Sequence, residues 1–348
     1  MENFKKLEIS QKNLYGNLEK IKKIANNKKI CVMVKANAYG HGINKICRLL
    51  ENKVDFFGVA NINEALKIRA ITNNKILIVG KTYEFDLCIK NNISFAIDGA
   101  RHLEKLINFL NKKPTDNCIN IHIKVNTGMN RLGVCDINEF KKLFYLCEEN
   151  KINVEGVFTH FSTADCDSTF FLKQLKIFDN FINEIPKRNL PMVHVGGSGV
   201  LTQIVNGVNF EFDMIRVGIA LYGYCKGLKV KPVLKIKSNL IKVFTVEKGE
   251  RVGYSNGFIA TKQTKIGIVP LGYADGVYRK LKAGGLVKIK NKKYKIIGNV
   301  CMDMFFVDLT NSNINEGEEV VVFEDAKKWA QILGTIPYEI LTNFSLVR

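Results

Sequence analysis

The stretch ICVMVKANAYGHG, residues 30–42, begins with an apolar run and ends in a loop with two glycines. The run at 30–34 predicts a buried strand, and Lys35 follows it directly. Lysine is among the residues that proteins bury least often. Lys35 is therefore either a surface lysine, where the strand reaches water, or an amine that serves chemistry in a cleft.

Outward from this stretch, apolar segments of strand length alternate with segments of helical length as far as about residue 218. We predict eight strands, at 30–36, 55–61, 75–80, 93–98, 120–126, 154–162, 191–197 and 211–218. Regular strand–helix alternation predicts a parallel sheet. Eight such units in about 200 residues favour a closed (β/α)8 barrel, the TIM barrel, over an open sheet.

The sequence pattern changes after LYGYCKG (221–227). From there alternating strands dominate, with hairpin-like turns at KAGG and KNKK, which predicts a mostly antiparallel β domain. We therefore divide the α/β chain into an N-terminal barrel, residues 1–228, and a β-rich C-terminal domain, residues 229–348.

Composition narrows the class of protein. The formal charge of +19 comes from lysines scattered among acidic residues, so we predict no dedicated nucleic-acid site. The nine cysteines form no C-x-x-C pair, which argues against a disulfide framework and a structural zinc site, and we predict no metal. The chain shows no signal-peptide core and no apolar run of membrane length. These features predict a cytoplasmic protein that binds no membrane.

Alternation within the barrel strands predicts which side chains face the interior, because successive residues point to opposite faces. Valine and isoleucine occupy the outer positions of three strands. The side chains predicted to face inward are Cys31, Met33, Lys35, His122, Lys124, Asn126, Met214, Arg216 and Gly218. Buried cations require an anion or a covalent partner. The interior of the barrel mouth is therefore a candidate site for an anionic or carbonyl ligand.

Two glycine-rich loops indicate the kind of anion. HVGGSGV (194–200) follows the seventh strand and RVGIALYG (216–223) follows the eighth. Many barrels bind phosphate at these two loops, through backbone N–H groups. A phosphate loop, an inward arginine and Lys35 together suit a Schiff base between lysine and pyridoxal 5'-phosphate.

Eight motifs extend this interpretation over both predicted domains: VKANAYGHG, KVNTGMNRLG, THFSTAD, DMIRVGIALYG, VGYSNGF, PLGYADG, GNVCMDM and TIPYEIL. In this order they resemble the alanine racemase family, pyridoxal phosphate enzymes of fold-type III that make D-alanine for peptidoglycan. The resemblance runs nearly end to end. It implies a homodimer with shared active sites and alanine as the substrate.

The resemblance implies two catalytic residues. Lys35 is expected to anchor the cofactor and act as the base on one face of the substrate α-carbon. Tyr254, from the other subunit, is expected to act as the acid/base on the opposite face. Arg131 and the backbone N–H of Met302 are expected to bind the substrate carboxylate, and Tyr273 to line the path of the substrate.

The same resemblance implies the cofactor contacts. Arg131 is expected at the phenolic oxygen and Arg216 at the pyridine nitrogen, with His160 hydrogen-bonded behind Arg216. The residues expected at the phosphate are Tyr39, Ser198, Gly218 and Ile219. Lys124 either pairs with a carboxylate or is carbamylated, as in some members of the family.

Other interpretations stay open from the residues alone. Tyr254 and Arg131 could be ordinary loop residues, and His160 a structural barrel histidine. Asn299 stands where the family usually has arginine, and the chain ends before a segment that adds a phosphate contact in the family. A broader or serine-specific racemase, a non-catalytic pyridoxal phosphate-binding protein and a basic binding protein are the alternatives.

Overall fold

The computed structural model describes residues 4–185 and 190–344. Within them the chain forms two compact units. One comprises residues 4–14, 39–41 and 232–344, and the other comprises the described residues of 15–38 and 42–231. The expectation that the chain ends before a phosphate-binding segment concerns its last residues, of which 345–348 lie outside the described part.

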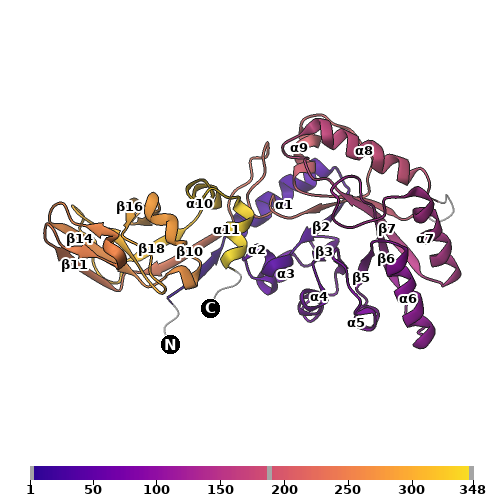
Figure 1. The fold of residues 1–348 in the computed structure, drawn as a ribbon, viewed down its shortest axis with the longest axis horizontal. Helices are drawn as coiled ribbons and strands as arrows, with labels where there is room; N and C mark the ends of the chain where they lie inside the picture. Colours follow the sequence, from indigo (N-terminus) through magenta and orange to yellow (C-terminus); the bar gives the residue numbers. More distant parts are fainter. Residues whose placement is uncertain (1–3, 186–189, 345–348) are drawn as a thin grey trace. The chain divides into compact units, whose positions relative to one another are not determined.

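The larger unit is built on eight parallel strands that close into a barrel (Figure 1). The strands are β2 (Lys29–Met33), β3 (Phe56–Val59), β4 (Lys75–Ile78), β5 (Ser94–Ile97), β6 (Asn120–Lys124), β7 (Asn153–His160), β8 (Met192–Gly196) and β9 (Met214–Val217). Strand β2 pairs in parallel with both β3 and β9, which closes the ring. The predicted (β/α)8 barrel is confirmed.

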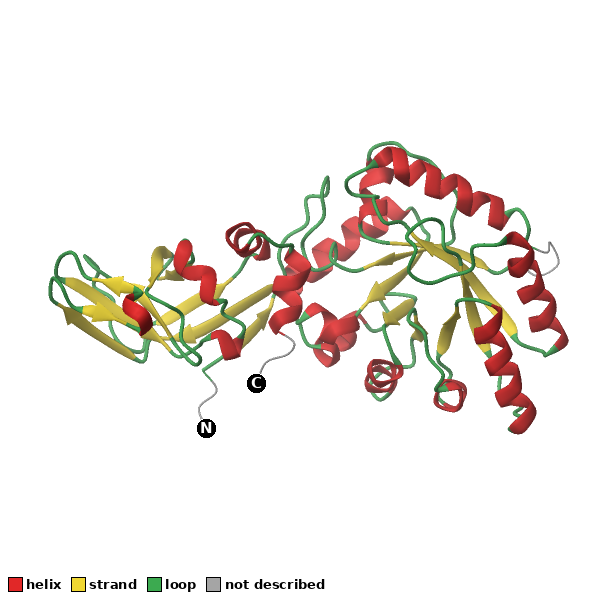
Figure 2. Ribbon diagram, viewed as in Figure 1, coloured by secondary structure: helices red, strands yellow, loops and turns green. Residues whose placement is uncertain are grey.

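Helices follow the barrel strands along the chain and lie outside them, as Figure 2 shows. The helices up to residue 205 are α1 (Gln11–Ala25), α2 (Lys35–Tyr39), α3 (Ile43–Leu50), α4 (Ile62–Arg69), α5 (Phe85–Lys90), α6 (Ala100–Lys112), α7 (Ile137–Glu149), α8 (Ser168–Ile182) and α9 (Gly199–Val205). Side-chain caps set several starts. Asp136 accepts from the Glu139 N–H at α7, and Asp167 accepts from two N–H groups at α8.

The other unit is antiparallel, as predicted. Eight of its strands form one sheet, in the order β1-β10-β18-β15-β16-β17-β14-β11, and β12 pairs with β13. The strands are β1 (Lys6–Ile9), β10 (Leu234–Asn239), β11 (Lys242–Val246), β12 (Arg251–Val252), β13 (Phe258–Ile259), β14 (Thr264–Val269), β15 (Leu286–Ile289), β16 (Lys292–Ile297), β17 (Phe305–Asp308) and β18 (Glu319–Phe323). Its helices are the 3-10 turns η1 (Tyr254–Asn256), η2 (Tyr273–Asp275) and η3 (Arg279–Ala283), with α10 (Ala326–Leu333) and α11 (Pro337–Asn343).

Strand β1 lies in this antiparallel sheet, although the domain boundaries predicted from the sequence place residues 1–228 in the barrel. Lys6 is registered with Lys237 and Ile9 with Leu234 along β10. Pairing between segments so far apart leaves no local signal in a four-residue strand. Among the described helices, none has both the length and the apolar character that a membrane span requires.

Candidate active site

Lys35 does not belong to the first barrel strand, which ends at Met33; it opens the short helix α2. The next residues, Ala36, Asn37 and Ala38, have φ values of 51°, 52° and 54°, so the chain makes a left-handed turn here. Left-handed conformation costs an L-residue about 1–2 kcal/mol. Several such residues in a row persist only where surrounding contacts hold them.

Hydrogen bonds from the next barrel unit hold this turn. The carboxylate of Glu64 accepts from the Ala36 N–H at 2.7 Å and from the Ala60 N–H at 2.8 Å. The side chain of Asn37 accepts from the Ile43 N–H at 2.8 Å, which ties the turn to the start of α3. Glu64 thus joins the loops after β2 and β3, and these contacts fix the backbone directly after Lys35.

Several positively charged side chains lie close together at the mouth of the barrel. Burial lowers the pKa of Lys35, and the positive charges of Arg131 and Arg216 lower it further, against the opposing effect of Glu64. Burial, Arg131 and Arg216 also lower the pKa of Lys124, to about 8. The sequence prediction that these side chains converge is thus reflected in their mutual electrostatic effects. A half-buried amine with a lowered pKa is a better nucleophile and base at neutral pH than a surface lysine.

His160 ends β7 and lines a narrow cavity with Lys124 and Arg131. Burial and the neighbouring cations, Arg216 first, lower the pKa of its imidazole to about 3. The ring is therefore neutral at physiological pH. A neutral ring in this position can pack against a ligand or accept a hydrogen bond without adding to the positive charge.

The neutral state of His160 predicts a loss of stability in acid. Below about pH 6.5 the unfolded chain protonates this histidine while the native chain does not, so the free energy of unfolding falls as the pH falls. From pH 7.5 to 5.5 this contribution amounts to about 1.4 kcal/mol. Urea unfolding at the two pH values should show a drop smaller by this amount in His160→Gln. An equal drop in both proteins would contradict the assignment.

Arg216 is buried in the barrel with uncharged partners. Its guanidinium donates to the Thr159 carbonyl at 2.7 Å and to His194 Nδ1 at 2.9 Å, and it lies 4.5 Å from the centre of the Phe158 ring. The imidazole that accepts from Arg216 is thus that of His194, whereas the sequence predicts a hydrogen bond with His160. A Cβ atom on Gly196 would come within 2.1 Å of Arg216 Nη2, so only glycine leaves room for this arginine.

Ser198 joins the two glycine-rich loops. Its hydroxyl accepts from the N–H groups of Gly218 at 3.3 Å and Ala220 at 3.0 Å. Gly197 before it has a φ of 106°, which favours glycine. Ile219 is buried between these donors. The loops after β8 and β9 therefore present convergent backbone N–H groups beside a hydroxyl, a donor set that suits a phosphate.

The predicted residues of the C-terminal unit lie close together there. Tyr254 and Met302 line one pocket, with Gly253, Cys301, Asp303, Met304 and Phe306. The N–H of Tyr273 donates to the Cys301 carbonyl at 3.0 Å, and Gly272 approaches Met302 so closely that a Cβ would come within 2.1 Å of its oxygen. Tyr254, Tyr273 and Met302 are 69%, 47% and 50% exposed in the single chain. Three large side chains are thus exposed together in this unit.

Tyr254 lies in a turn whose backbone is strained. Gly253, Ser255 and Asn256 all have positive φ. The side-chain amide of Asn299 donates to the Tyr254 carbonyl at 2.7 Å and anchors the turn. The sequence marked Asn299 only as a departure from the family, because a contact to a backbone carbonyl 45 residues away leaves no pattern.

Two other features bear on the predicted ligands. Tyr39 ends α2, is buried, and has its ring centre 6.1 Å from that of Tyr338.

The described residues contain no group of three or more histidine, cysteine, aspartate or glutamate side chains suited to a metal.

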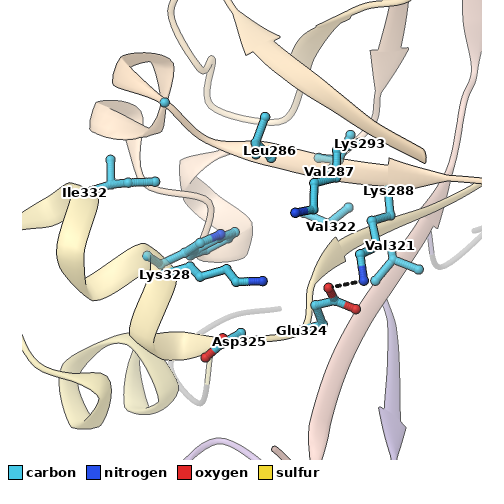
Figure 3. A pocket seen from close by; sticks show the side chains of 12 residues that line it. Leu286, Val287, Lys288, Lys293, Val321, Val322, Glu324, Asp325, Lys328 and Ile332 are labelled. Atoms are coloured by element: carbon cyan, nitrogen blue, oxygen red, sulfur yellow. Dashed lines mark ion pairs between the residues drawn. The ribbon is translucent and has the colours of Figure 1, made fainter. Parts of the chain in front are cut away.

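A separate pocket lies between β15, β18 and α10 in the C-terminal unit, as Figure 3 shows. An ion pair between Lys288 and Glu324 crosses it beside Val287 and Val322. None of the predicted site residues lines this pocket, and we assign it no chemistry.

Comparison with known proteins covers most of the chain. The sequence profile described as "Alanine racemase, N-terminal domain" matches residues 9–226, and "Alanine racemase, C-terminal domain" matches 233–347. The chain is 36% identical over 332 residues to an alanine racemase of Fusobacterium nucleatum, covering 91% of this chain and 90% of that protein.

Solved structures agree with the sequence matches. An alanine racemase of Clostridium difficile 630 superposes with a TM-score of 0.91 at 31% identity, over 98% of this chain and 93% of that one. An alanine racemase of Bartonella henselae, described "with covalently bound pyridoxal phosphate", superposes with a TM-score of 0.86 at 27% identity, over 100% of this chain and 98% of that one.

Proposed function

The chain belongs to the alanine racemase family of enzymes, and from this premise we propose that it interconverts L- and D-alanine with pyridoxal 5'-phosphate bound at the barrel mouth. The observation that carries the proposal is the placement of Lys35. This amine is partly buried among Arg131, Arg216 and Lys124, its pKa is lowered, and the turn that follows it is held in a left-handed conformation.

The residues present fit this cofactor. The barrel mouth holds more positive than negative charge, and its loops offer backbone N–H donors next to Ser198. A phosphate and a phenolate supply the missing negative charge, and an aldehyde takes the amine of Lys35 as its covalent partner. Residues proposed to hold the cofactor are Lys35, Tyr39, Arg131, His160, Ser198, Arg216, Gly218 and Ile219.

When bound, the cofactor supplies an electron sink for the pair left behind by the α-proton. The chain supplies the proton transfers. Racemisation removes the proton from one face and returns one to the other, so two groups on opposite faces are needed. We assign Lys35 Nζ to one face and the Tyr254 hydroxyl to the other.

The remaining roles concern binding and orientation. We propose that Arg131 and the backbone N–H of Met302 bind the substrate carboxylate, and that Tyr273 lines the path of the substrate. Arg216 is proposed to face the pyridine nitrogen as a donor, since its guanidinium cannot accept a proton. A neutral His160 beside it adds no further charge.

We also propose that two copies of the chain share their active sites as a homodimer. The exposure of Tyr254, Tyr273 and Met302 on one surface of the C-terminal unit supports this. In that arrangement the N-terminal domain, residues 1–228 apart from strand β1, binds the cofactor, and the β-rich domain, residues 229–348, completes the site of the partner. All nine cysteines are free, which supports a reducing, cytoplasmic location. The role proposed for the enzyme there, from its family, is to supply D-alanine for peptidoglycan.

One experiment tests activity and substrate together. The purified protein, supplied with pyridoxal phosphate, is incubated with single L-amino acids in D2O. With L-alanine we expect optical rotation to decay to zero while deuterium enters the α-carbon. Faster exchange with L-serine would identify a serine racemase. No exchange with any amino acid would identify a non-catalytic binding protein and overturn the proposal.

A further inference from the structure

A row of buried polar side chains crosses the barrel interior below Arg216. The guanidinium Nη1 lies 2.9 Å from His194 Nδ1, and His194 Nε2 lies 2.8 Å from His122 Nδ1. His122 Nε2 in turn lies 3.0 Å from a carboxylate oxygen of Glu155. Both imidazoles are fully buried. Four side chains, from β9, β8, β6 and β7, therefore form one continuous hydrogen-bonded row.

The chemistry of its two ends fixes the direction of every bond in the row. A guanidinium only donates, so Nδ1 of His194 must accept and its Nε2 must carry the proton. That proton is donated to His122 Nδ1, which leaves the His122 proton on Nε2, facing Glu155. Although burial alone would raise it, the pKa of Glu155 is lowered to about 2 by hydrogen bonds from His122, Lys75 and Ser94. The row thus ends on an ionised acceptor.

Two features of the backbone make room for the row. Consecutive residues Ile121 and His122 of β6 pair with Val154 and Gly156 of β7, so Glu155 is the extra residue of a β-bulge. Bulges redirect side chains, and this one turns Glu155 toward His122. A Cβ on Gly156 would come within 2.3 Å of His122 Nδ1 and 3.0 Å of His194 Nε2. Only glycine therefore lets the two imidazoles meet.

The row also explains how the barrel accommodates a buried cation. Arg216 is 3% exposed, and its hydrogen bonds within the described part of the chain go to neutral acceptors. A buried cation without compensation is strongly destabilising. Glu155 is the carboxylate that this row of hydrogen bonds connects to Arg216, and each bond polarises the next.

We propose that Glu155 is a positioning residue that, through the fixed tautomers of His122 and His194, holds the Arg216 guanidinium in its orientation toward the cofactor ring. The orientation toward a cofactor rests on the proposed function. The tautomers do not, and they can be measured in the protein with or without pyridoxal phosphate.

Nuclear magnetic resonance of the imidazole nitrogens tests the row directly. The chain has five histidines, so histidine-labelled protein gives a spectrum that single His→Gln variants can assign. At pH 7.5 we expect His122 and His194 both neutral with the proton on Nε2. A proton on Nδ1 of either ring, or a doubly protonated ring, would overturn the proposal, whatever the racemase assay shows.

Variants at Glu155 separate its charge from its place as an acceptor. In Glu155→Gln the amide oxygen still accepts from His122, so the tautomers should persist, but the His122 Nε2 proton should shift upfield because the bond loses its charge assistance. In Glu155→Leu the acceptor of the His122 Nε2 proton is gone, so we expect a mixture of tautomers at His122, while Arg216 still keeps the proton of His194 on Nε2. Affinity for pyridoxal phosphate should fall by about tenfold, the value of one charged hydrogen bond.

Asp55→Asn is the matched control, because Asp55 is a carboxylate directly before β3 that accepts from the Ile30 N–H outside the row. It should leave the His122 and His194 resonances and the cofactor affinity unchanged. If Glu155→Leu does not fold, the chemical shift of the His122 Nε2 proton in Glu155→Gln tests the proposal by itself. Unchanged imidazole resonances in Glu155→Gln, or changes that Asp55→Asn reproduces, would overturn the proposal.

Discussion

Replacing Lys35 with alanine is expected to lower the rate of alanine racemisation by about 10³-fold or more and to abolish the visible absorbance of the cofactor-loaded protein. The amine is assigned two tasks, covalent attachment and proton transfer, and a positioned general base alone contributes about 10²- to 10⁴-fold. The lowered pKa of Lys35 equips it for both tasks. Absorbance titration with pyridoxal phosphate and a coupled D-alanine assay measure the two effects separately.

Lys29→Ala is the control for this variant. Lys29 begins the same strand, β2, but its side chain is exposed, so its loss should alter neither readout. Small primary amines added to Lys35→Ala should restore part of the proton transfer, which a collapsed site would not permit. If Lys35→Ala kept its absorbance or its activity, the assignment of the cofactor to this lysine would be wrong.

The barrel could be predicted from sequence because its strands are short, apolar and separated by helices of regular length. Alternation within them also identified faces correctly. His122 and Arg216 do point inward, as their hydrogen bonds to His194 show. Which residues of such a strand face inward is well determined, since shifting the strand by one residue would put these polar side chains against the helices.

The sequence could not predict where the chain departs from regular geometry. The sequence predicts that Lys35 ends a strand, yet Lys35 opens a left-handed turn whose first four residues, Ala36 to Tyr39, are not glycine. The bulge at Glu155 reverses the alternation of β7, so parity counting alone places this side chain on the wrong face. Contacts such as Glu64 to Ala36 depend on two loops meeting in space, which no local pattern records.

Replacing Tyr254 with phenylalanine is expected to slow racemisation by about 10²- to 10⁴-fold while leaving part of the proton exchange intact. The equilibrium constant between enantiomers is one, so kcat/KM must fall equally in both directions. Exchange with solvent has no such constraint. One enantiomer should still lose its α-proton to Lys35 and regain deuterium without inversion, and the other should not.

A mixture of the two inactive variants tests whether Tyr254 acts across subunits. A dimer of one Lys35→Ala chain and one Tyr254→Phe chain has one site with both residues intact if Tyr254 serves the partner, and none if it serves its own chain. Random reassociation makes half of the dimers mixed, each with one working site, so activity should return to about a quarter of the wild-type value. The double variant Lys35→Ala/Tyr254→Phe mixed with Tyr254→Phe has no site with both residues in either arrangement, and controls for gains from reassociation alone. Recovery of nothing would place Tyr254 in its own chain's site or outside the reaction.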